Sequence, residues 1–247
     1  MKCDISKCFP SVNHQILKNL LRQEIACPDT LWLIEKIIDS FETGNEFDSL
    51  FPADSPFRKK RPRGIPIGNL TSQLFVNVYL DPLDKFVKNC LGEKYYLRYV
   101  DDFLILHKNK KHLHQIKNAV ASFLRENLHM ELHPKKQRIF PVNQGIDFLG
   151  YVTFKDFKLL RKSNKMSFRK KLLKIRKLYQ KGLLEKEKIQ ASITSWLAHT
   201  QYADTYRLRK RIFGEPLNAK DQKKISRFID SWKKSPSREP SGQLRLF

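Results

Sequence analysis

The 247-residue sequence has little cysteine, no long apolar segment and a shortage of acidic residues. Its four cysteines are Cys3, Cys8, Cys27 and Cys90. No two of them form a Cys-x-x-Cys pair, which argues against a disulfide framework or a zinc site and is typical of a reducing compartment. No run of about 18 apolar residues is present, and the first residues do not form the apolar core of a signal peptide. We therefore expect a cytoplasmic protein that does not bind membranes.

The shortage of acidic residues leaves a large positive charge. Forty-eight Lys and Arg face 25 Asp and Glu, a formal net charge of +23. Such an excess predicts a polyanionic partner, because each neutralised phosphate releases counterions; ribosomal and membrane-surface proteins can be equally basic. Residues 1–154 hold 22 basic and 17 acidic residues, a net of +5, whereas residues 155–247 hold 26 and 8, a net of +18. The sequence therefore predicts two parts with different tasks.

The first part alternates helical and extended patterns. A short strand is predicted over 2–9, and the spacing of apolar residues predicts helices over about 16–25 and 28–41. A Gly/Pro-rich turn from Gly64 leads into a helix whose expected cap is Thr71 or Ser72. Apolar runs on both sides of an Asp-Asp pair at 101–102 then predict a hairpin with both carboxylates at its tip.

A helix over about 110–128 and a second hairpin around Gly145 complete this part, and basic helical patterns follow from about 160. This order predicts the α+β class, with a split βαβ (ferredoxin-like) domain whose antiparallel sheet is covered by helices on one face, followed by a basic helical lobe. The polar tail over 235–247 is predicted to be disordered.

The Asp101-Asp102 pair is the first candidate site. An isolated Asp pair is usually a solvated turn. Here apolar strands hold both carboxylates in place, and adjacent like charges are costly unless a cation neutralises them. If the strand that carries Asp4 is a neighbour, Asp4 and Asp101 converge on one pocket, the minimum for two Mg²⁺ ions in nucleotidyl transfer. The spacing alone does not establish this convergence.

Five segments resemble the motifs of reverse transcriptases. They are DISKCFPSVNH from Asp4 (motif A), GIPIGNLTSQ at 64–73 (motif B), YVDD at 99–102 (motif C), LHPKK at 132–136 (motif D) and FLGY at 148–151 (motif E). They occur in the family order over about 1–155. The resemblance implies a polymerase palm over 1–158 and a helical thumb over 159–234. It also implies that the fingers, which precede motif A in the family, are missing here, so that the chain is a fragment or the lobe is supplied elsewhere.

The resemblance implies roles for individual palm residues. Asp4, Asp101 and the backbone carbonyl of Ile5 would be ligands of two Mg²⁺ ions, for which Mn²⁺ can substitute, and Asp102 would be the neighbouring metal-site carboxylate. Phe9 would be the gate that excludes a ribose 2′-hydroxyl, although an isolated Phe in this pattern is also typical of a core residue.

Motif B separates classes within the family. Most reverse transcriptases carry Pro-Gln-Gly there, whereas this chain has Pro66, Ile67 and Gly68, followed by Gln73. This variant resembles the enzymes of diversity-generating retroelements, which misincorporate opposite template adenine. An apolar side chain cannot make the hydrogen bonds of an amide, so base-pair geometry would be selected by shape alone. The alternative is that Ile67 is only a packing residue. Gly68 would let the backbone approach the nucleotide closely.

The remaining motifs imply contacts to the substrate and the duplex. Lys135 is the candidate acid for the leaving pyrophosphate, although the spacing does not distinguish it from Lys136, and a Lys pair can equally be a solvated loop. The expected primer grip consists of Phe148, Leu149, Gly150 and Tyr151. The expected nucleic-acid contacts in the thumb are Arg169, Lys170, Lys174 and Lys177. A plain basic amphipathic helix or a coiled-coil flank would show the same pattern.

Together these features predict an RNA-directed DNA polymerase of a bacterial or phage diversity-generating retroelement. It would use dNTPs to copy a template-repeat RNA into adenine-mutagenised cDNA, hold an RNA/DNA duplex, and bind an accessory variability protein. The alternatives are a reverse transcriptase of a group II intron, retron or phage-defence system, and a non-catalytic nucleic-acid-binding fragment.

Overall fold

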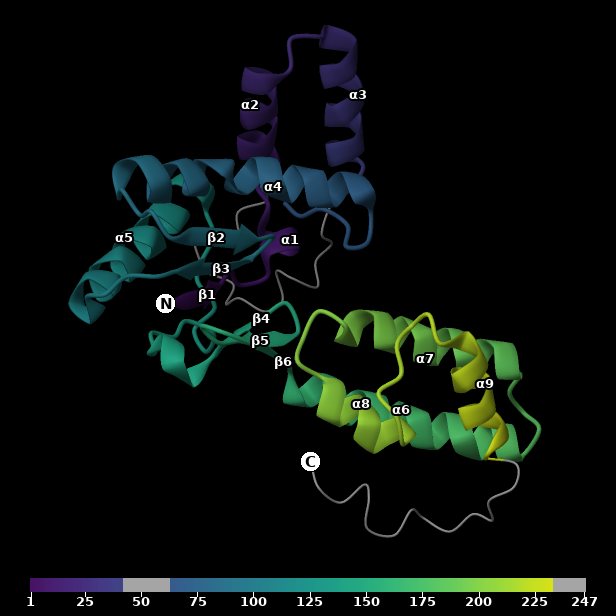
Figure 1. Cartoon of the computed structure of the whole chain (residues 1–247). Helices are drawn as coiled ribbons and strands as arrows, with labels where there is room; N and C mark the ends of the chain where they lie inside the picture. The colour runs from purple at the N-terminus through teal and green to yellow at the C-terminus, as the bar shows by residue number, and fades with distance from the viewer. Residues whose placement is uncertain (42–62, 233–247) are drawn as a thin grey trace, which may run out of the picture. The chain divides into compact units, whose positions relative to one another are not determined.

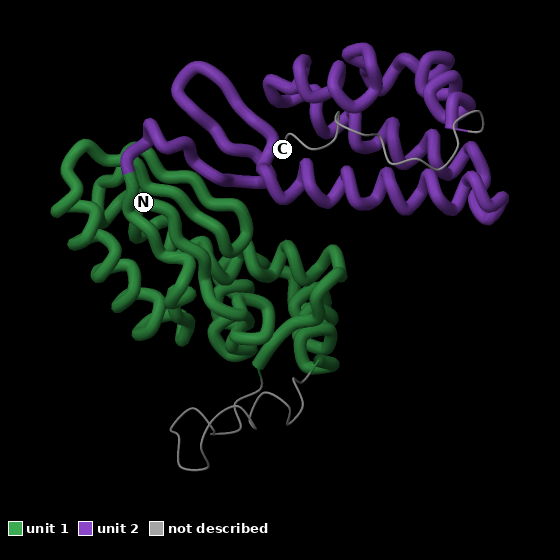
Figure 2. The backbone as a smooth tube through the Cα atoms, turned by 90° about the horizontal axis from the view of Figure 1, so that it is seen from below, with its two compact units in different colours: residues 1–140 green, residues 141–247 purple. Residues whose placement is uncertain are grey.

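A computed structural model describes residues 1–41 and 63–232 of the chain (Figure 1). The chain divides into two compact units, Met1–Phe140 and Pro141–Phe247 (Figure 2). The tail over 235–247, which we expected to be disordered, lies outside the described residues. None of the helices within the described ranges is long and apolar enough to cross a membrane.

The first unit contains a three-stranded antiparallel sheet. Its strands are β1 (Lys2–Asp4), β2 (Tyr96–Tyr99) and β3 (Asp102–Ile105), in the order β1-β3-β2. The central strand is the most buried, with Phe103 and Ile105 fully inaccessible. The prediction of a strand over residues 2–9 was too long. Lys7 has a φ of 46°, which a strand cannot accommodate, and a short helix follows it.

Helices complete the first unit. They are α1 (Cys8–Ser11), α2 (His14–Glu24), α3 (Pro28–Asp39), α4 (Leu70–Lys85) with its π-helical extension η3 (Phe86–Cys90), and α5 (Lys110–Leu128). Apolar residues of α2, α4 and α5 form one core with the sheet, and α2 and α3 stand as a helical hairpin on α4 (Figure 1). The cap of α4 is Asn69, not Thr71 or Ser72 as predicted, because Asn69 is the last residue with an extended backbone.

The second unit begins with a small antiparallel sheet. After the 3₁₀ turn η4 (Val142–Gln144), it contains β4 (Ile146–Phe148), β5 (Tyr151–Thr153) and β6 (Lys158–Leu160) in sequential order. The prediction of a hairpin around Gly145 was wrong, since the turn lies at Leu149–Gly150. Gly145 precedes β4, and a Cβ there would lie 2.6 Å from a methyl carbon of Val152. Close packing against Val152 therefore requires a residue without a side chain at position 145.

Within the described residues, four helices follow the small sheet. They are α6 (Lys162–Gln180), α7 (Lys186–Thr200), α8 (Tyr206–Phe213) and α9 (Gln222–Asp230). Their apolar faces form a separate core that includes stacked rings of Phe168 and Trp196, 3.8 Å apart. Sheets and helices of this kind confirm the α+β class. The compact units divide at 140/141, so the β4–β5 hairpin belongs with the basic helices; the functional boundary at 158/159 stays a prediction.

Candidate active site and nucleic-acid contacts

The three candidate metal-site carboxylates, Asp4, Asp101 and Asp102, lie together at one end of the first sheet. Asp4 ends β1 and is the register partner of Asp102, the first residue of β3. The amide of Ile5 donates a hydrogen bond to the carbonyl of Asp101, at 3.0 Å. Strand pairing therefore brings Asp4 beside two acidic residues that lie almost 100 positions later in the sequence.

The turn that carries Asp101 is strained. Tyr99 pairs with Asp102, which leaves Val100 and Asp101 as the two central residues of the β2–β3 hairpin. Val100 has a φ of 55°, a left-handed conformation that costs a β-branched residue roughly 1–3 kcal/mol. Strain of this kind persists only where neighbouring groups hold the backbone in place.

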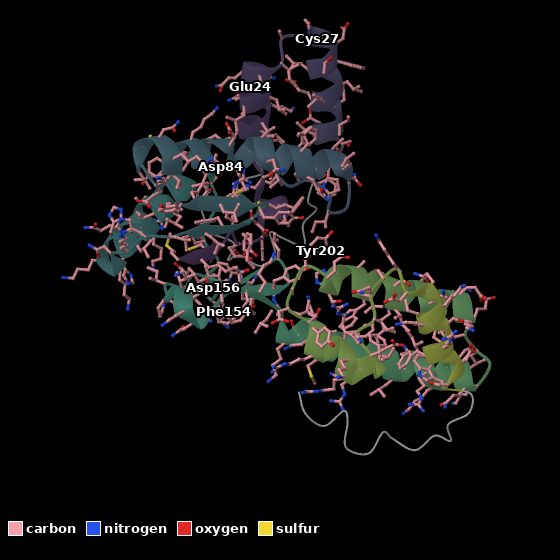
Figure 3. The ribbon with its side chains drawn as sticks, viewed as in Figure 1. Glu24, Cys27, Asp84, Phe154, Asp156 and Tyr202 are labelled. Atoms are coloured by element: carbon pink, nitrogen blue, oxygen red, sulfur yellow. The ribbon has the colours of Figure 1, made fainter. Side chains whose placement is uncertain are left out.

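Arg98 is the neighbour that holds this turn. Its guanidinium donates to the Val100 carbonyl at 3.0 Å and, through two nitrogens at 2.8 and 2.6 Å, to both carboxylate oxygens of Asp84. Asp84 lies on α4 (Figure 3) and also accepts from the Tyr96 hydroxyl at 2.6 Å. No sequence motif pointed to Arg98 and Asp84 as parts of the site. The available signal was a basic residue at an inward-facing position of a strand, where alternation predicts an apolar one.

The site concentrates negative charge. Burial raises the pKa of the Asp101 carboxyl, and the charges of Asp4 and Asp102 raise it further. Two ammonium groups partly offset this repulsion. The Nζ of Lys136 lies 2.9 Å from an oxygen of Asp4, and the Nζ of Lys2 lies 3.4 Å from an oxygen of Asp102. The hydrogen bond to Asp4 raises the pKa of Lys136.

The structure distinguishes Lys135 from Lys136, which the spacing in the sequence did not. Lys136 reaches the carboxylates, whereas the side chain of Lys135 makes no ion pair within the described part of the chain. The backbone amide of Lys135 donates to Nδ1 of His133 at 3.2 Å, which fixes the loop but not the side chain. Of these two lysines, Lys136 is the one whose side chain lies beside the acidic cluster.

The donor types of this cluster suit a hard divalent cation. In residues 1–41 and 63–232, no three His, Cys, Asp or Glu side chains are arranged as a complete metal-binding group. The cluster nevertheless offers carboxylate oxygens. Burial, and after it the charges of Asp4 and Asp102, raises the pKa of Asp101, and a dication would offset both effects. The residues therefore fit Mg²⁺ by chemistry, and Ile5, with its amide on Asp101, lies at the same place.

Backbone hydrogen bonds join motif B to motif A. The amide of Ile65 donates to the Phe9 carbonyl at 3.1 Å, and the amide of Gly64 donates to the Val12 carbonyl at 2.8 Å. His14 bonds the Gly64 carbonyl through Nε2 at 2.7 Å. Phe9 is half-buried and packs against the core of the first unit, as the core alternative expects. Its role as a gate stays a prediction.

The tip of motif B faces solvent. Pro66 is half-buried, but Ile67 is 77% exposed, which counts against the interpretation of Ile67 as a packing residue. Gly68 has a φ of 104° and open space around it, so its backbone conformation, not crowding, requires glycine. Gln73 is exposed on the first turn of α4.

The expected primer grip is the β4–β5 hairpin of the second unit. Phe148 and Tyr151 pair across the strands, and Leu149 and Gly150 form the turn between them. Phe148 is buried, whereas Leu149 is 46% exposed. The hairpin therefore presents one apolar side chain at its tip.

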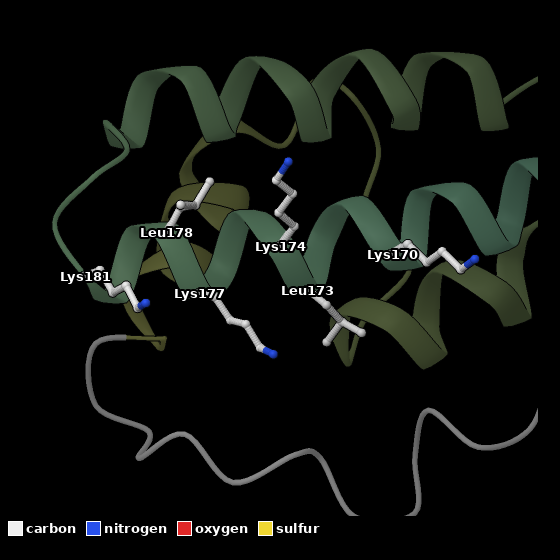
Figure 4. A pocket seen from close by; sticks show the side chains of 6 residues that line it. All are labelled: Lys170, Leu173, Lys174, Lys177, Leu178 and Lys181. Carbon is white, nitrogen blue, oxygen red and sulfur yellow. The ribbon is translucent and has the colours of Figure 1, made fainter.

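The basic residues of α6 do not share one face. Lys170, Lys174 and Lys177 are exposed and line an open groove with Leu173, Leu178 and Lys181 (Figure 4). We call the four lysines the α6 lysine row. They span about 16 Å of helix. Arg169, the fourth expected contact, is half-buried, and its Nε is buried without a hydrogen-bond partner within the described ranges. Lys181 was missed, although it continues the helical spacing by four residues.

Comparisons with known proteins agree with the motifs. The sequence profile of the family described as "Reverse transcriptase (RNA-dependent DNA polymerase)" matches residues 1–153. The "Putative COX1/OXI3 intron 2 protein" of Saccharomyces cerevisiae is 24% identical over 211 residues, 61% of this chain and 23% of that protein. "Protein YkfC" of Escherichia coli is 26% identical over 184 residues, 60% of this chain and 45% of that protein.

A viral protein matches a shorter stretch more closely. "Protein P" of Duck hepatitis B virus is 40% identical over 78 residues, 32% of this chain and 9% of that protein. The chain therefore spans less than half the length of each of these three curated relatives.

Proposed function

The chain belongs to the reverse transcriptase family, and on this premise we propose that it is an RNA-directed DNA polymerase that works by two-metal nucleotidyl transfer. The observation that carries the proposal is the pairing of Asp4 with Asp102 across β1 and β3, with Asp101 in the adjoining turn. In this proposal residues 1–158 are the palm, built on a split βαβ plan, and residues 159–234 are the thumb.

The acidic cluster is the proposed metal site. Asp4, Asp101 and the Ile5 carbonyl would hold Mg²⁺, and Asp102 would be the neighbouring carboxylate. When bound, Mg²⁺ would lower the pKa of the primer 3′-hydroxyl and neutralise charge on the triphosphate. Lys136 is the proposed acid, since it carries a proton at Nζ beside the same carboxylates and can donate it to the leaving pyrophosphate.

Motifs A and B would select the nucleotide. Backbone hydrogen bonds join Phe9 to the motif B turn, so the two sides of the nucleotide pocket would keep a fixed position relative to each other. Phe9 would exclude a 2′-hydroxyl, and Pro66, Ile67, Gly68 and Gln73 would contact the incoming base or its template partner. The exposure of Ile67 supports this role because a contact residue must be accessible.

The second unit would hold the nucleic acid. The hairpin over 148–151 would grip the primer end, and the α6 lysine row would bind phosphates of the RNA/DNA duplex. Exposed lysines at regular helical spacing support a sequence-independent electrostatic contact.

For the subclass, we propose a diversity-generating retroelement that copies a template-repeat RNA together with an accessory variability protein. Ile67 in place of the usual Gln supports this subclass. A second candidate is an intron-type reverse transcriptase, which the similarity to a yeast intron protein favours. Paired near-identical repeats that differ at adenines beside the gene would favour the retroelement, and their absence would favour the intron type.

Primer extension tests the activity. The chain, alone and within any longer reading frame that contains it, is supplied with an RNA template, a DNA primer, dNTPs and Mg²⁺. We expect extension by the wild type and none by Asp101→Asn. If both proteins bind the duplex but extend no primer, alone or within a longer reading frame, the chain would instead be a non-catalytic nucleic-acid-binding fragment.

A further inference from the structure

The turn between β4 and β5 has an unfavourable backbone for its sequence. Leu149 and Gly150 have φ values of 49° and 87°, and positive φ at both central residues is the pattern of a type I′ hairpin turn. This turn favours Asn-Gly, whereas the Cβ of a leucine is crowded in the left-handed region. The turn is therefore strained, and groups outside the hairpin must hold it.

Helix α6 supplies one set of such groups. The Gly150 carbonyl accepts hydrogen bonds from the backbone amide of Arg161 at 3.0 Å and from the side-chain amide of Asn164 at 3.3 Å. A Cβ on Gly150 would lie only 2.9 Å from the same Asn164 nitrogen. Asn164 thus packs directly on the turn as well as binding it.

Helix α7 supplies the second set. The Tyr151 hydroxyl lies 2.8 Å from the His199 carbonyl and 2.9 Å from its Nδ1, and the two rings are 4.8 Å apart. A tyrosine hydroxyl has one proton, so it donates to the carbonyl and accepts from Nδ1–H of His199. Asn164 and His199 therefore hold the turn from two helices.

We propose that Asn164 and His199 are positioning residues that fix the strained Leu149–Gly150 turn at the place where it meets the primer end. This proposal rests on the proposed primer-gripping role of the hairpin. Without these bonds the turn would relax toward a less strained conformation, and the primer terminus would bind less tightly. Chemistry on a correctly bound terminus would be unaffected, because neither residue touches the reacting atoms.

Steady-state kinetics of the full chain test the role of His199. We expect His199→Leu to raise KM for the primer–template about threefold to tenfold, the effect of one net hydrogen bond, while kcat at saturating primer–template stays within about twofold. His199→Asn, whose amide can donate from nearly the position of Nδ1, should restore most of the affinity. Asn164→Ala should resemble His199→Leu, and Ser163→Ala on the same turn of α6 is its control.

A double-mutant cycle shows whether the imidazole acts through Tyr151. Tyr151→Phe should weaken primer binding at least as much as His199→Leu, because it removes both bonds of the hydroxyl. The double variant should be no weaker than Tyr151→Phe alone. Tyr206→Phe is the matched control, since Tyr206 is 55% exposed and its hydroxyl makes no hydrogen bond within the described ranges. Additive effects of His199 and Tyr151 would overturn the proposal.

Hydrogen exchange tests the positioning role of His199 without relying on polymerase activity. His199→Leu should speed exchange of the Arg161 amide, which donates to the Gly150 carbonyl, and weaken binding of an RNA/DNA hybrid with a recessed 3′ end, even if the wild type extends no primer. A failed extension assay would then count against the proposed function alone. Unchanged exchange and unchanged hybrid affinity in a folded His199→Leu variant would overturn the positioning role.

Discussion

The ammonium nitrogen of Lys136 lies 2.9 Å from a carboxylate oxygen of Asp4, although the two residues are 132 positions apart. The loop over 131–133 makes this contact possible. Its backbone bonds that of Asp4 and Ser6, through the His133 amide and the Glu131 carbonyl at 2.8 Å each. Backbone hydrogen bonds therefore connect motif D to motif A. Lys136 lies just after these bonds in the chain, which keeps its side chain close to Asp4.

Lys136→Met should lower the rate of nucleotide addition about 10²- to 10⁴-fold, the usual contribution of a positioned acid. Lys135→Met, the adjacent control, should stay within about twofold because its side chain does not reach the carboxylates. Single-turnover incorporation with saturating dNTP measures both rates. Equal losses in the two variants would remove the assignment of Lys136 as the acid.

Asp4→Asn and Asp101→Asn should each abolish primer extension while RNA binding and folding persist. A neutral amide is a poor ligand for a hard dication, and neither substitution changes the side-chain volume appreciably. Mg²⁺ should raise the melting temperature of the wild type but not of either variant, since a ligand stabilises only a fold that binds it. Normal extension by either variant would contradict the proposed metal ligands.

Asp101 should also make stability depend on pH when no divalent cation is present. Burial, with the charges of Asp4 and Asp102, raises its pKa above the ordinary 3.8, so the folded state binds this proton more tightly than the unfolded state. The stability that protonation of Asp101 contributes is fully present below about pH 4. It is lost as the pH rises through the pKa of Asp101 in the folded state.

Asp101→Asn should therefore melt at a higher temperature than the wild type at pH 7 in EDTA, and the difference should shrink toward pH 4. Thermal melts of both proteins across this range measure the difference, in which the other titrating groups largely cancel. A difference that is independent of pH would mean that the folded structure does not perturb this carboxyl.

The α6 lysine row should account for part of the salt dependence of duplex binding. Lys174→Gln with Lys177→Gln should reduce the slope of log affinity against log salt by about 1.4–1.8, at about 0.7–0.9 per neutralised phosphate. Arg169→Gln is the control, because its Nε is buried; we expect a change in stability but not in slope. A reduced slope in Arg169→Gln, together with an unchanged slope in the double lysine variant, would contradict the assignment.

Local patterns predicted most of the elements. The β2–β3 hairpin was predicted because apolar runs flank two aspartates, and α5 because its apolar residues keep helical spacing over 110–128. The turn at Leu149–Gly150 was not predicted, since leucine is a poor residue for a left-handed conformation. Contacts with α6 and α7, which local sequence patterns do not reveal, hold it there.

Contacts of the site could be predicted only in part. The acidic cluster was proposed because apolar strands flank Asp101-Asp102 and because the segments around Asp4 and Asp101 resemble reverse transcriptase motifs; the spacing alone did not bring them together. The partner of Asp4 was not predicted, because Lys135 and Lys136 are chemically identical and the choice depends on a loop anchored to Asp4 itself. Arg98 was missed for a similar reason: its partner Asp84 comes from α4, and no local spacing joins them.

Ile67→Gln should raise fidelity opposite template adenine more than opposite the other bases. Ile67 is 77% exposed at the tip of motif B, so glutamine can replace it without disturbing the core. A glutamine amide would add hydrogen bonds near the nascent base pair, and one net bond contributes about 0.5–1.5 kcal/mol. Because about 1.4 kcal/mol corresponds to a factor of ten, adenine errors should fall a fewfold to tenfold.

Sequencing of cDNA copied from one template by the two enzymes measures this change, with errors opposite the other three bases as the internal control. Ile67→Leu is the matched variant, since it keeps an apolar side chain of the same size and should leave the error spectrum unchanged. A larger effect of glutamine would mean that the turn moves as well. Equal adenine error rates in all three proteins would show that Ile67 does not set fidelity, and the retroelement subclass would lose the residue that supports it.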